Sequence, residues 1–147
     1  MSVYLFDINV LVALMWTNHE HHRVVTDWRR SHQRANWATC PLTQAGFVRI
    51  SSNPRIFQDA PTPAKVIEVL HSNLKNPAHR FWTDDIPLTQ AVTPFAGRFT
   101  GHQQVTDAYL FGLAIHKRGV LLTFDAGIAA LVEENSGSLK ALEILKV

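Results

Sequence analysis

The chain has 147 residues, a formal net charge of +2, and 46% hydrophobic residues. This length and composition fit one globular domain with a hydrophobic core, and no apolar run approaches the roughly 20 residues of a membrane span. The small net charge excludes a protein that binds nucleic acid through its overall charge. A single cysteine, Cys40, excludes an internal disulfide and fits the reducing cytoplasm, where we expect the protein to act.

A carboxylate ends the first apolar run of the chain. Residues 3–6 have the pattern of a short buried strand, Asp7 follows at once, and residues 7–16 have the pattern of a turn and a first helix. A charge at the end of a buried strand costs free energy unless another group neutralises it. We therefore interpret Asp7 as a candidate ligand of a divalent metal ion, whose other ligands must come from later in the chain.

A basic amphipathic helix is predicted over residues 19–32. Its apolar positions Val24, Val25 and Trp28 recur three or four residues apart. Four arginines accompany them: Arg23, Arg29, Arg30 and Arg34. A solvated helix face is the simpler interpretation of these charges, and a face that contacts phosphates is the alternative. The histidines at positions 19–22 lack the spacing of a zinc site, so we interpret them as residues at the helix start or on the surface.

The middle of the chain alternates between strands and helices. We predict strands at residues 36–40 and 79–83, and helices at residues 41–52 and 64–74, with a proline-rich loop at 54–63 between the two helices.

Two further segments in this region are predicted to be irregular. The adjacent acids Asp84 and Asp85 precede an Ile-Pro pair, which favours a turn or helix-cap role over catalysis. Residues 94–103 contain two glycines and are predicted to form a flexible loop.

The last third of the chain contains two more placed carboxylates. Residues 105–119 are apolar nearly all round, as in a central buried helix, and Asp107 lies at its amino-terminal end. Residues 120–124 are typical of a buried strand, which Asp125 ends. A helix to about residue 134 and a final strand at 142–145 complete the prediction.

This alternation predicts an α/β fold in one domain, residues 1–147, with a mainly parallel sheet and helices on both faces. In such sheets, ligands bind outside the carboxyl ends of the strands. Asp7 and Asp125 lie at two of these ends, and Asp107 begins the helix that leads into the second strand. We therefore expect the three carboxylates to converge.

Three neighbouring carboxylates repel one another unless a cation lies between them. Oxygen ligands without thiolates or a histidine cage favour Mg²⁺ or Mn²⁺ over zinc. Such an ion activates water and holds a phosphate oxygen, which is the chemistry of phosphodiester hydrolysis. Each aspartate alone has a structural alternative, because all three precede helices and aspartate is a common helix N-cap.

Three segments together resemble the motif blocks of the PIN domain: residues 6–11 (FDINVL), 100–110 (TGHQQVTDAYL) and 122–125 (LTFD). The most similar branch is the VapC toxins of bacterial type II toxin–antitoxin modules, which residues 39–50 (TCPLTQAGFVRI) also resemble. The resemblance runs from end to end of the chain. It implies a PIN-like three-layer sandwich and a Mg²⁺- or Mn²⁺-dependent endoribonuclease that cleaves RNA, with tRNA and rRNA as the candidate substrates. It also implies a cognate antitoxin and a toxin homodimer. The lack of a long apolar run separately predicts no membrane association.

The same resemblance assigns roles to individual residues. Asp7, Asp107 and Asp125 match the metal-site acids of the family. Asn9 and Thr106 match polar positions that orient the neighbouring carboxylate and bind water or substrate. Gln44 stands where many members carry a glutamate. Because an amide brings no charge, one metal ion is expected rather than two.

Two other functions remain open from the sequence. An aspartate-nucleophile phosphatase would use Asp7 as the nucleophile, but such enzymes typically carry an acid two residues later, where this chain has Asn9. A PIN-like domain that binds RNA or a partner without catalysis is suggested only by Gln44.

Overall fold

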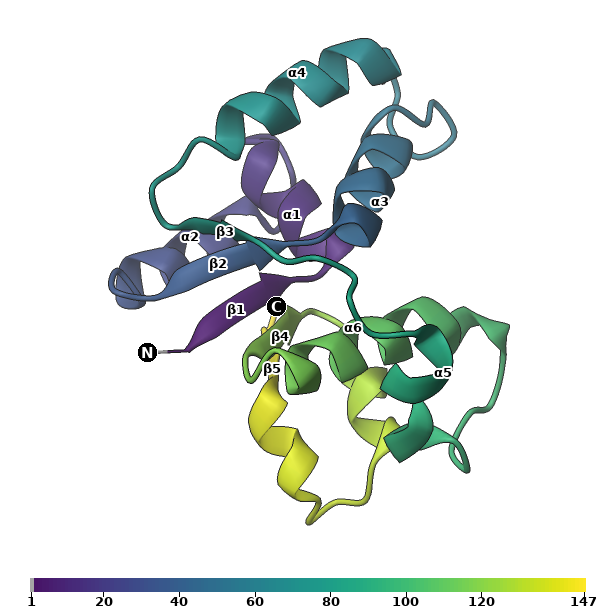
Figure 1. Ribbon diagram of the computed structural model, residues 1–147. Helices are drawn as coiled ribbons and strands as arrows, with labels where there is room; N and C mark the ends of the chain where they lie inside the picture. The colour runs from purple at the N-terminus through teal and green to yellow at the C-terminus, as the bar shows by residue number, and fades with distance from the viewer. Residues whose placement is uncertain (1) are drawn as a thin grey trace.

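A five-stranded parallel sheet forms the centre of the computed structural model, which describes residues 2–147 (Figure 1). The strands lie in the order β3-β2-β1-β4-β5, and all four pairings are parallel. The strands are β1 (Val3–Phe6), β2 (Asn36–Thr39), β3 (His79–Phe81), β4 (Val120–Thr123) and β5 (Leu142–Ile144). The helices are α1 (Ile8–Met15), α2 (His22–Ser31), α3 (Pro41–Ser51), α4 (Pro63–Asn73), α5 (Leu88–Ala91) and α6 (Val105–His116).

The helices cover both faces of the sheet, as the sequence predicted. Helices α1 to α4 lie on one side of it, and α5, α6 and the carboxy-terminal turns lie on the other (Figure 1). Side chains of a strand alternate between the two layers, so Leu5 packs into the cluster around α6 while Phe6 packs into the cluster around α1. Both side chains are fully buried. The prediction of an α/β sandwich with a parallel sheet is confirmed.

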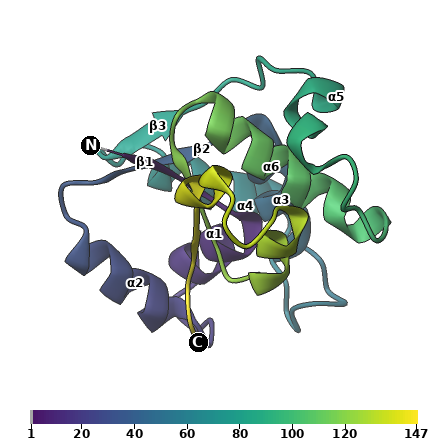
Figure 2. The same cartoon turned by 90° about the horizontal axis from the view of Figure 1, so that it is seen from below.

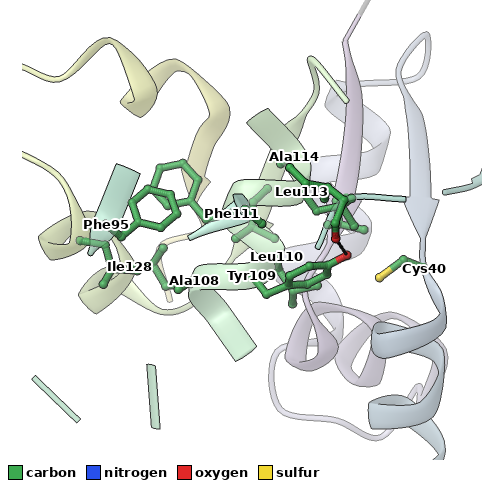
Figure 3. Close-up of a cluster of buried hydrophobic side chains, with 14 of the residues drawn as sticks. Cys40, Phe95, Ala108, Tyr109, Leu110, Phe111, Leu113, Ala114 and Ile128 are labelled. Carbon is green, nitrogen blue, oxygen red and sulfur yellow. Dashed lines mark hydrogen bonds between the residues drawn. The ribbon is translucent and has the colours of Figure 1, made fainter. Parts of the chain in front are cut away.

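Helix α6 is the central helix of its layer. Seven consecutive residues, from position 108 to position 114, are buried. Figure 3 shows six of them, all but Gly112, in the cluster that also contains Phe95. The Phe95 and Phe111 rings are stacked with their centroids 4.9 Å apart. The Tyr109 hydroxyl donates a hydrogen bond to the Ile86 carbonyl oxygen at 3.2 Å. These contacts explain why the sequence of α6 is apolar all round.

Gly112 allows the backbone of α5 to contact α6. A Cβ at this position would lie 2.1 Å from the carbonyl oxygen of Ala91, which is a backbone atom and cannot rotate away. We expect Gly112→Ala to lower the free energy of unfolding by about 2–3 kcal/mol through overpacking. Urea unfolding measures this change. Gly137→Ala is the matched control, because nothing lies within 4 Å of its Cβ position. A loss of stability in the control as large as in Gly112→Ala would contradict the explanation.

Helix α6 does not end on a left-handed glycine. The left-handed residue is Arg118, with φ of 58°, while Gly119 does not have a positive φ. Gly119 is needed for space, because its Cβ would lie 2.6 Å from the carbonyl oxygen of Val3 and 2.5 Å from the ring of Trp82.

Two other predicted segments need correction, and one short helix was not predicted. The helix expected up to residue 134 is a 3₁₀ helix over Ala126–Leu131. The loop expected at 94–103 contains two short 3₁₀ turns and the fully buried Phe95. Helix α5 was not predicted, because its four residues are too few to give a periodic apolar pattern. Within residues 2–147, no helix has the length and apolarity required to cross a membrane.

Candidate active site

The three predicted aspartates lie at the carboxyl edge of the central strands. Asp7 directly follows β1, and Asp125 is separated from the end of β4 by one residue. The two strands are adjacent in the sheet, with Phe6 paired to Leu122. Asp107 lies in the first turn of α6, which packs against β1 and β4. Because α6 runs back along the sheet into β4, its first turn returns Asp107 to the same edge.

Asp7 is a buried carboxylate with a hydrogen bond to each oxygen. Its side chain is the N-cap of α1, where Oδ1 accepts from the Ile8 N–H at 2.7 Å. Oδ2 accepts from the Thr123 hydroxyl at 2.6 Å. Burial raises the pKa of Asp7, the two hydrogen bonds lower it, and the Asp125 charge raises it further. The carboxylate is thus held in one orientation while its charge remains costly.

Thr123 joins two of the acids and was not predicted as a site residue. It is fully buried, and its hydroxyl donates to Asp7 and accepts from the Asp125 backbone N–H at 3.0 Å. The only signal in the sequence was a hydroxyl at the end of an otherwise apolar strand. That signal is weak, because threonine is common in strands.

Asp107 is a second acid of the site whose pKa is raised. Burial raises its pKa to about 7, and the negative charges of Asp7 and Asp125 contribute to the increase. This mutual effect shows that the three carboxylates lie close enough to repel one another. Asp125 is the most exposed of the three, and its Oδ1 accepts from the Gly127 N–H at 2.8 Å as the N-cap of the following 3₁₀ helix.

Asn9 and Thr106 are exposed side chains beside Asp7 and Asp107. In the described part of the chain, no hydrogen bond joins either of them to the three aspartates. The hydroxyl that orients Asp7 belongs to Thr123 instead. A role for Asn9 and Thr106 in contacting water or substrate stays a prediction.

Gln44 is held on the α1–α4 side of the sheet. Its Nε2 donates to the Thr39 hydroxyl at 3.0 Å, and the same hydroxyl lies 2.7 Å from His79 Nε2. Thr39 is fully buried, and it follows Ala38 on the strand beside β1. Asp7 accepts a hydrogen bond from Thr123. Leu121, two residues before Thr123 and therefore on the same face of β4, packs in the cluster around α6. Gln44 therefore has its described contacts away from the aspartates, and its role in the site stays a prediction.

Gly46 of α3 packs against Ile8 at the start of α1. A Cβ there would lie 2.3 Å from Cδ1 of Ile8, the residue whose N–H binds Asp7. This packing fixes the start of α1 against α3 and was not predicted.

The donor set fits a divalent cation in its chemistry. Asp7, Asp107 and Asp125 offer only carboxylate oxygens, which favour hard cations such as Mg²⁺ and Mn²⁺, and their repulsion would be relieved by a positive charge between them. Among residues 2–147, no three acidic, histidine or cysteine side chains are already grouped closely enough to hold a metal ion. The three aspartates thus form a loose cluster that a cation would have to draw together.

The other acidic and histidine clusters have structural roles. Asp85 pairs with Lys117 at 3.0 Å and with His116 at 3.4 Å, which ties the segment before α5 to the end of α6. His22 begins α2, and its Nδ1 lies 2.8 Å from the carbonyl oxygen of Ala13. His21 is the N-cap residue of α2 and packs against Phe124. These placements agree with the prediction of helix-start histidines. The prediction of a turn or helix cap at Asp84 and Asp85 is wrong, because both lie in an irregular segment before α5, whose N-cap residue is Pro87.

Comparison with known proteins gives consistent matches over most of the chain. The family model of the PIN domain matches residues 4–134. Ribonuclease VapC39 of Mycobacterium tuberculosis is 40% identical over 141 residues, which cover 96% of this chain and 98% of that protein. Ribonuclease VapC38 of the same organism is 44% identical over 131 residues, 88% of this chain and 90% of that protein.

A similar fold is found among solved structures. The crystal structure of VapBC2 from Rickettsia felis bound to a DNA fragment from their promoter contains a chain that aligns with a TM-score of 0.62 at 13% identity. The alignment covers 98% of this chain and 99% of that one. At this identity the likeness supports the fold alone.

Proposed function

Since this chain belongs to the PIN-domain family and groups there with the VapC ribonucleases, we propose that it is a metal-dependent endoribonuclease and the toxin of a toxin–antitoxin module. The observation that carries the proposal is the placement of Asp7, Asp107 and Asp125 at one edge of the sheet. Burial raises the pKa of Asp107 to about 7, and the charges of Asp7 and Asp125 add to the increase. A site that holds an acid so close to neutrality is suited to bind a cation at physiological pH.

We propose that Asp7, Asp107 and Asp125 hold one Mg²⁺ or Mn²⁺ ion. Such an ion, when bound, supplies an activated water and neutralises charge on the phosphodiester. The chain itself fixes the orientation of Asp7 through Thr123 and Ile8, so the carboxylate need not reorganise when the substrate arrives. Asp107 loses its proton near pH 7 and brings the additional negative charge that cation binding requires.

The partners of the proposed toxin follow from the same site and surface. We propose a cognate antitoxin that places a basic side chain among the three aspartates, where it would satisfy their repulsion. We also propose a homodimer, which would cover large apolar side chains that are about half exposed in the single chain. These are Ile67 on α4, Phe81 on β3 and Leu88 on α5.

An aspartate-nucleophile phosphatase is less well supported. Both oxygens of Asp7 already accept hydrogen bonds, which hold the carboxylate in one orientation. The residue two positions later is the exposed amide Asn9, which cannot act as a general acid. A non-catalytic RNA-binding role is also disfavoured, because the curated relatives are named ribonucleases.

The test is RNA cleavage by Asp7→Asn. We expect the substitution to lower the cleavage rate by a factor of about 10³ or more, because it removes a charged ligand while keeping the shape of the side chain. The measurement uses a mixture of tRNA and rRNA with Mg²⁺ or Mn²⁺, followed by mapping of the new RNA ends. A chelator should abolish the cleavage by the wild-type chain.

Asp59→Asn is the matched control. Asp59 is exposed, lies in the loop between α3 and α4, and has a φ of 60°, which asparagine tolerates. The control should cleave at the wild-type rate. Full cleavage by Asp7→Asn, or by the wild type in excess chelator, would exclude the proposed function.

A further inference from the structure

The amino edge of the sheet, opposite the aspartates, carries a basic hollow that the proposed function does not use. Its volume is about 510 Å³, which is within the range of small-ligand sites. Helix α2 runs from the carboxyl edge, where His21 packs on Phe124, to this edge, where its last turn reaches Tyr4 (Figure 2). The residues of this amino-edge hollow that matter here are Ser2, Tyr4, Arg30, His32, Gln33 and Arg34.

The charge of the amino-edge hollow is positive. Eight residues line it, of which two are arginines and none is acidic. Arg30 is paired with Asp27 at 2.9 Å and lies in the last turn of α2, where a cation also stabilises the helix dipole. Arg34 lies beyond the end of the helix, is exposed, and has no ion pair within residues 2–147. The positive charge of Arg34 in the hollow is therefore explained neither by stabilisation of a helix dipole nor by an ion pair with an acidic residue.

A rigid aromatic surface lies beside these cations. The His32 ring is stacked on the Trp28 ring with centroids 4.0 Å apart and an interplanar angle of 11°. Its Nδ1 lies 2.7 Å from the Trp28 carbonyl oxygen, and Tyr4 packs edge-on at 6.0 Å. Trp28 itself is anchored by a hydrogen bond from its Nε1 to Glu143 of β5. The imidazole is thus held in place before any ligand binds.

We propose that the amino-edge hollow binds single-stranded RNA at a distance from the cleavage site, with Arg34 and Arg30 on phosphates and His32 and Tyr4 beside a base. Bases stack on histidine, tyrosine and arginine side chains, and phosphates pair with arginine. A protein segment would need acidic residues to match the charge, whereas single-stranded RNA carries a phosphate at every nucleotide and a base that can lie against the fixed ring. This inference rests on the proposed function in taking RNA as the ligand.

The position of the hollow sets the length of RNA required. Ser2 and Asp7 are five residues apart along an extended segment, or roughly 16 Å at about 3.3 Å per residue. A stacked strand carries one phosphate per roughly 3.4 Å, so an RNA must extend at least about five nucleotides beyond the cleaved bond to occupy both sites. Shorter RNA should be cleaved without any contribution from the hollow.

The experiment compares the wild-type chain with Arg34→Gln and with Arg30→Gln on two RNAs that share one mapped cleavage site. The long RNA extends ten or more nucleotides beyond the cleavage site, and the short RNA extends two. For the long RNA, we expect KM to rise roughly fivefold per substitution with kcat unchanged. The salt dependence of binding, log K against log salt concentration, should lose about 0.7 in slope per lost phosphate contact. For the short RNA, neither constant should change.

Arg23→Gln is the control, because it removes the same charge from the same helix at a 92% exposed side chain outside the hollow. Equal KM values and salt slopes for Arg34→Gln and the wild type on the long RNA would overturn the proposal. A variant that binds RNA normally but weakens only a complex with a protein partner would also overturn it. Fluorescence anisotropy of labelled long RNA, measured without metal, tests RNA binding at the hollow separately from the proposed nuclease activity. Binding that depends on Arg34 without any cleavage would remove the proposed nuclease and keep the hollow.

Discussion

Replacing Asp107 with asparagine should stabilise the metal-free protein at pH 8 and abolish RNA cleavage. The pKa of Asp107 in the folded chain is about 7, well above the ordinary value of 3.8. The folded state therefore binds the proton more tightly than the unfolded state, and the stability of the wild type falls as pH rises from about 4 to above 7. Asparagine cannot ionise, so the variant avoids this loss.

The expected gain at pH 8 is roughly 2 kcal/mol after allowance for solvent screening, or about 5 °C in Tm. Thermal unfolding at pH 5 and pH 8 in a chelator measures it. The difference between variant and wild type should be much smaller at pH 5, where Asp107 is protonated in the folded wild type. Added Mg²⁺ or Mn²⁺ should stabilise the wild type, more at pH 8 than at pH 6, and should have little effect on the variant. A variant that is less stable than the wild type at pH 8 would contradict this account of the repulsion.

Thr123→Val should lower the cleavage rate by about 10-fold to 100-fold, although Thr123 touches neither substrate nor cation in this account. Valine keeps the shape of the buried side chain but removes the hydroxyl that donates to Asp7 at 2.6 Å and accepts from the Asp125 N–H. Loss of such an orienting group commonly weakens metal affinity or activity by this factor. It should also raise the pKa of Asp7, because one stabilising hydrogen bond to the charged form is lost.

The measurement is the cleavage rate as a function of pH and of metal concentration. The apparent metal dissociation constant of Thr123→Val should increase, and its pH profile should shift toward alkaline pH. Thr123→Ser should restore both, because the serine hydroxyl can make the same two hydrogen bonds. A Thr123→Val protein with wild-type metal affinity and pH profile would show that this hydroxyl only supports the fold.

The sequence was sufficient to predict the parallel sheet and the edge to which the three aspartates come. Asp7 and Asp125 each follow a buried apolar run, and topology alone brings such positions to one edge. Asp107 was predicted from the helix that leads directly back into β4. These inferences depend on the order of the elements and on the alternation of strands and helices along the chain, which the local sequence encodes.

The remaining parts of the site depend on contacts between distant segments, which no local pattern encodes. Thr123 belongs to the candidate site because its hydroxyl donates to Asp7, 116 positions away in the chain. The contacts of Gln44 depend on which side of β2 its helix covers, and they lead to Thr39 and His79. The approach of Gly112 to Ala91 likewise depends on α5, a four-residue helix that has no sequence period of its own.

Paramagnetic broadening of backbone amide signals by Mn²⁺ tests most directly whether the three aspartates form one cation site. Substoichiometric Mn²⁺ should broaden the signals of Ile8, Ala108 and Gly127 together, because each lies next to or near one of the acids. It should leave those of Arg34 and Ala35, at the opposite edge of the sheet, sharp. Broadening confined to one of the three segments, or centred on the histidines at positions 19–22, would contradict the account.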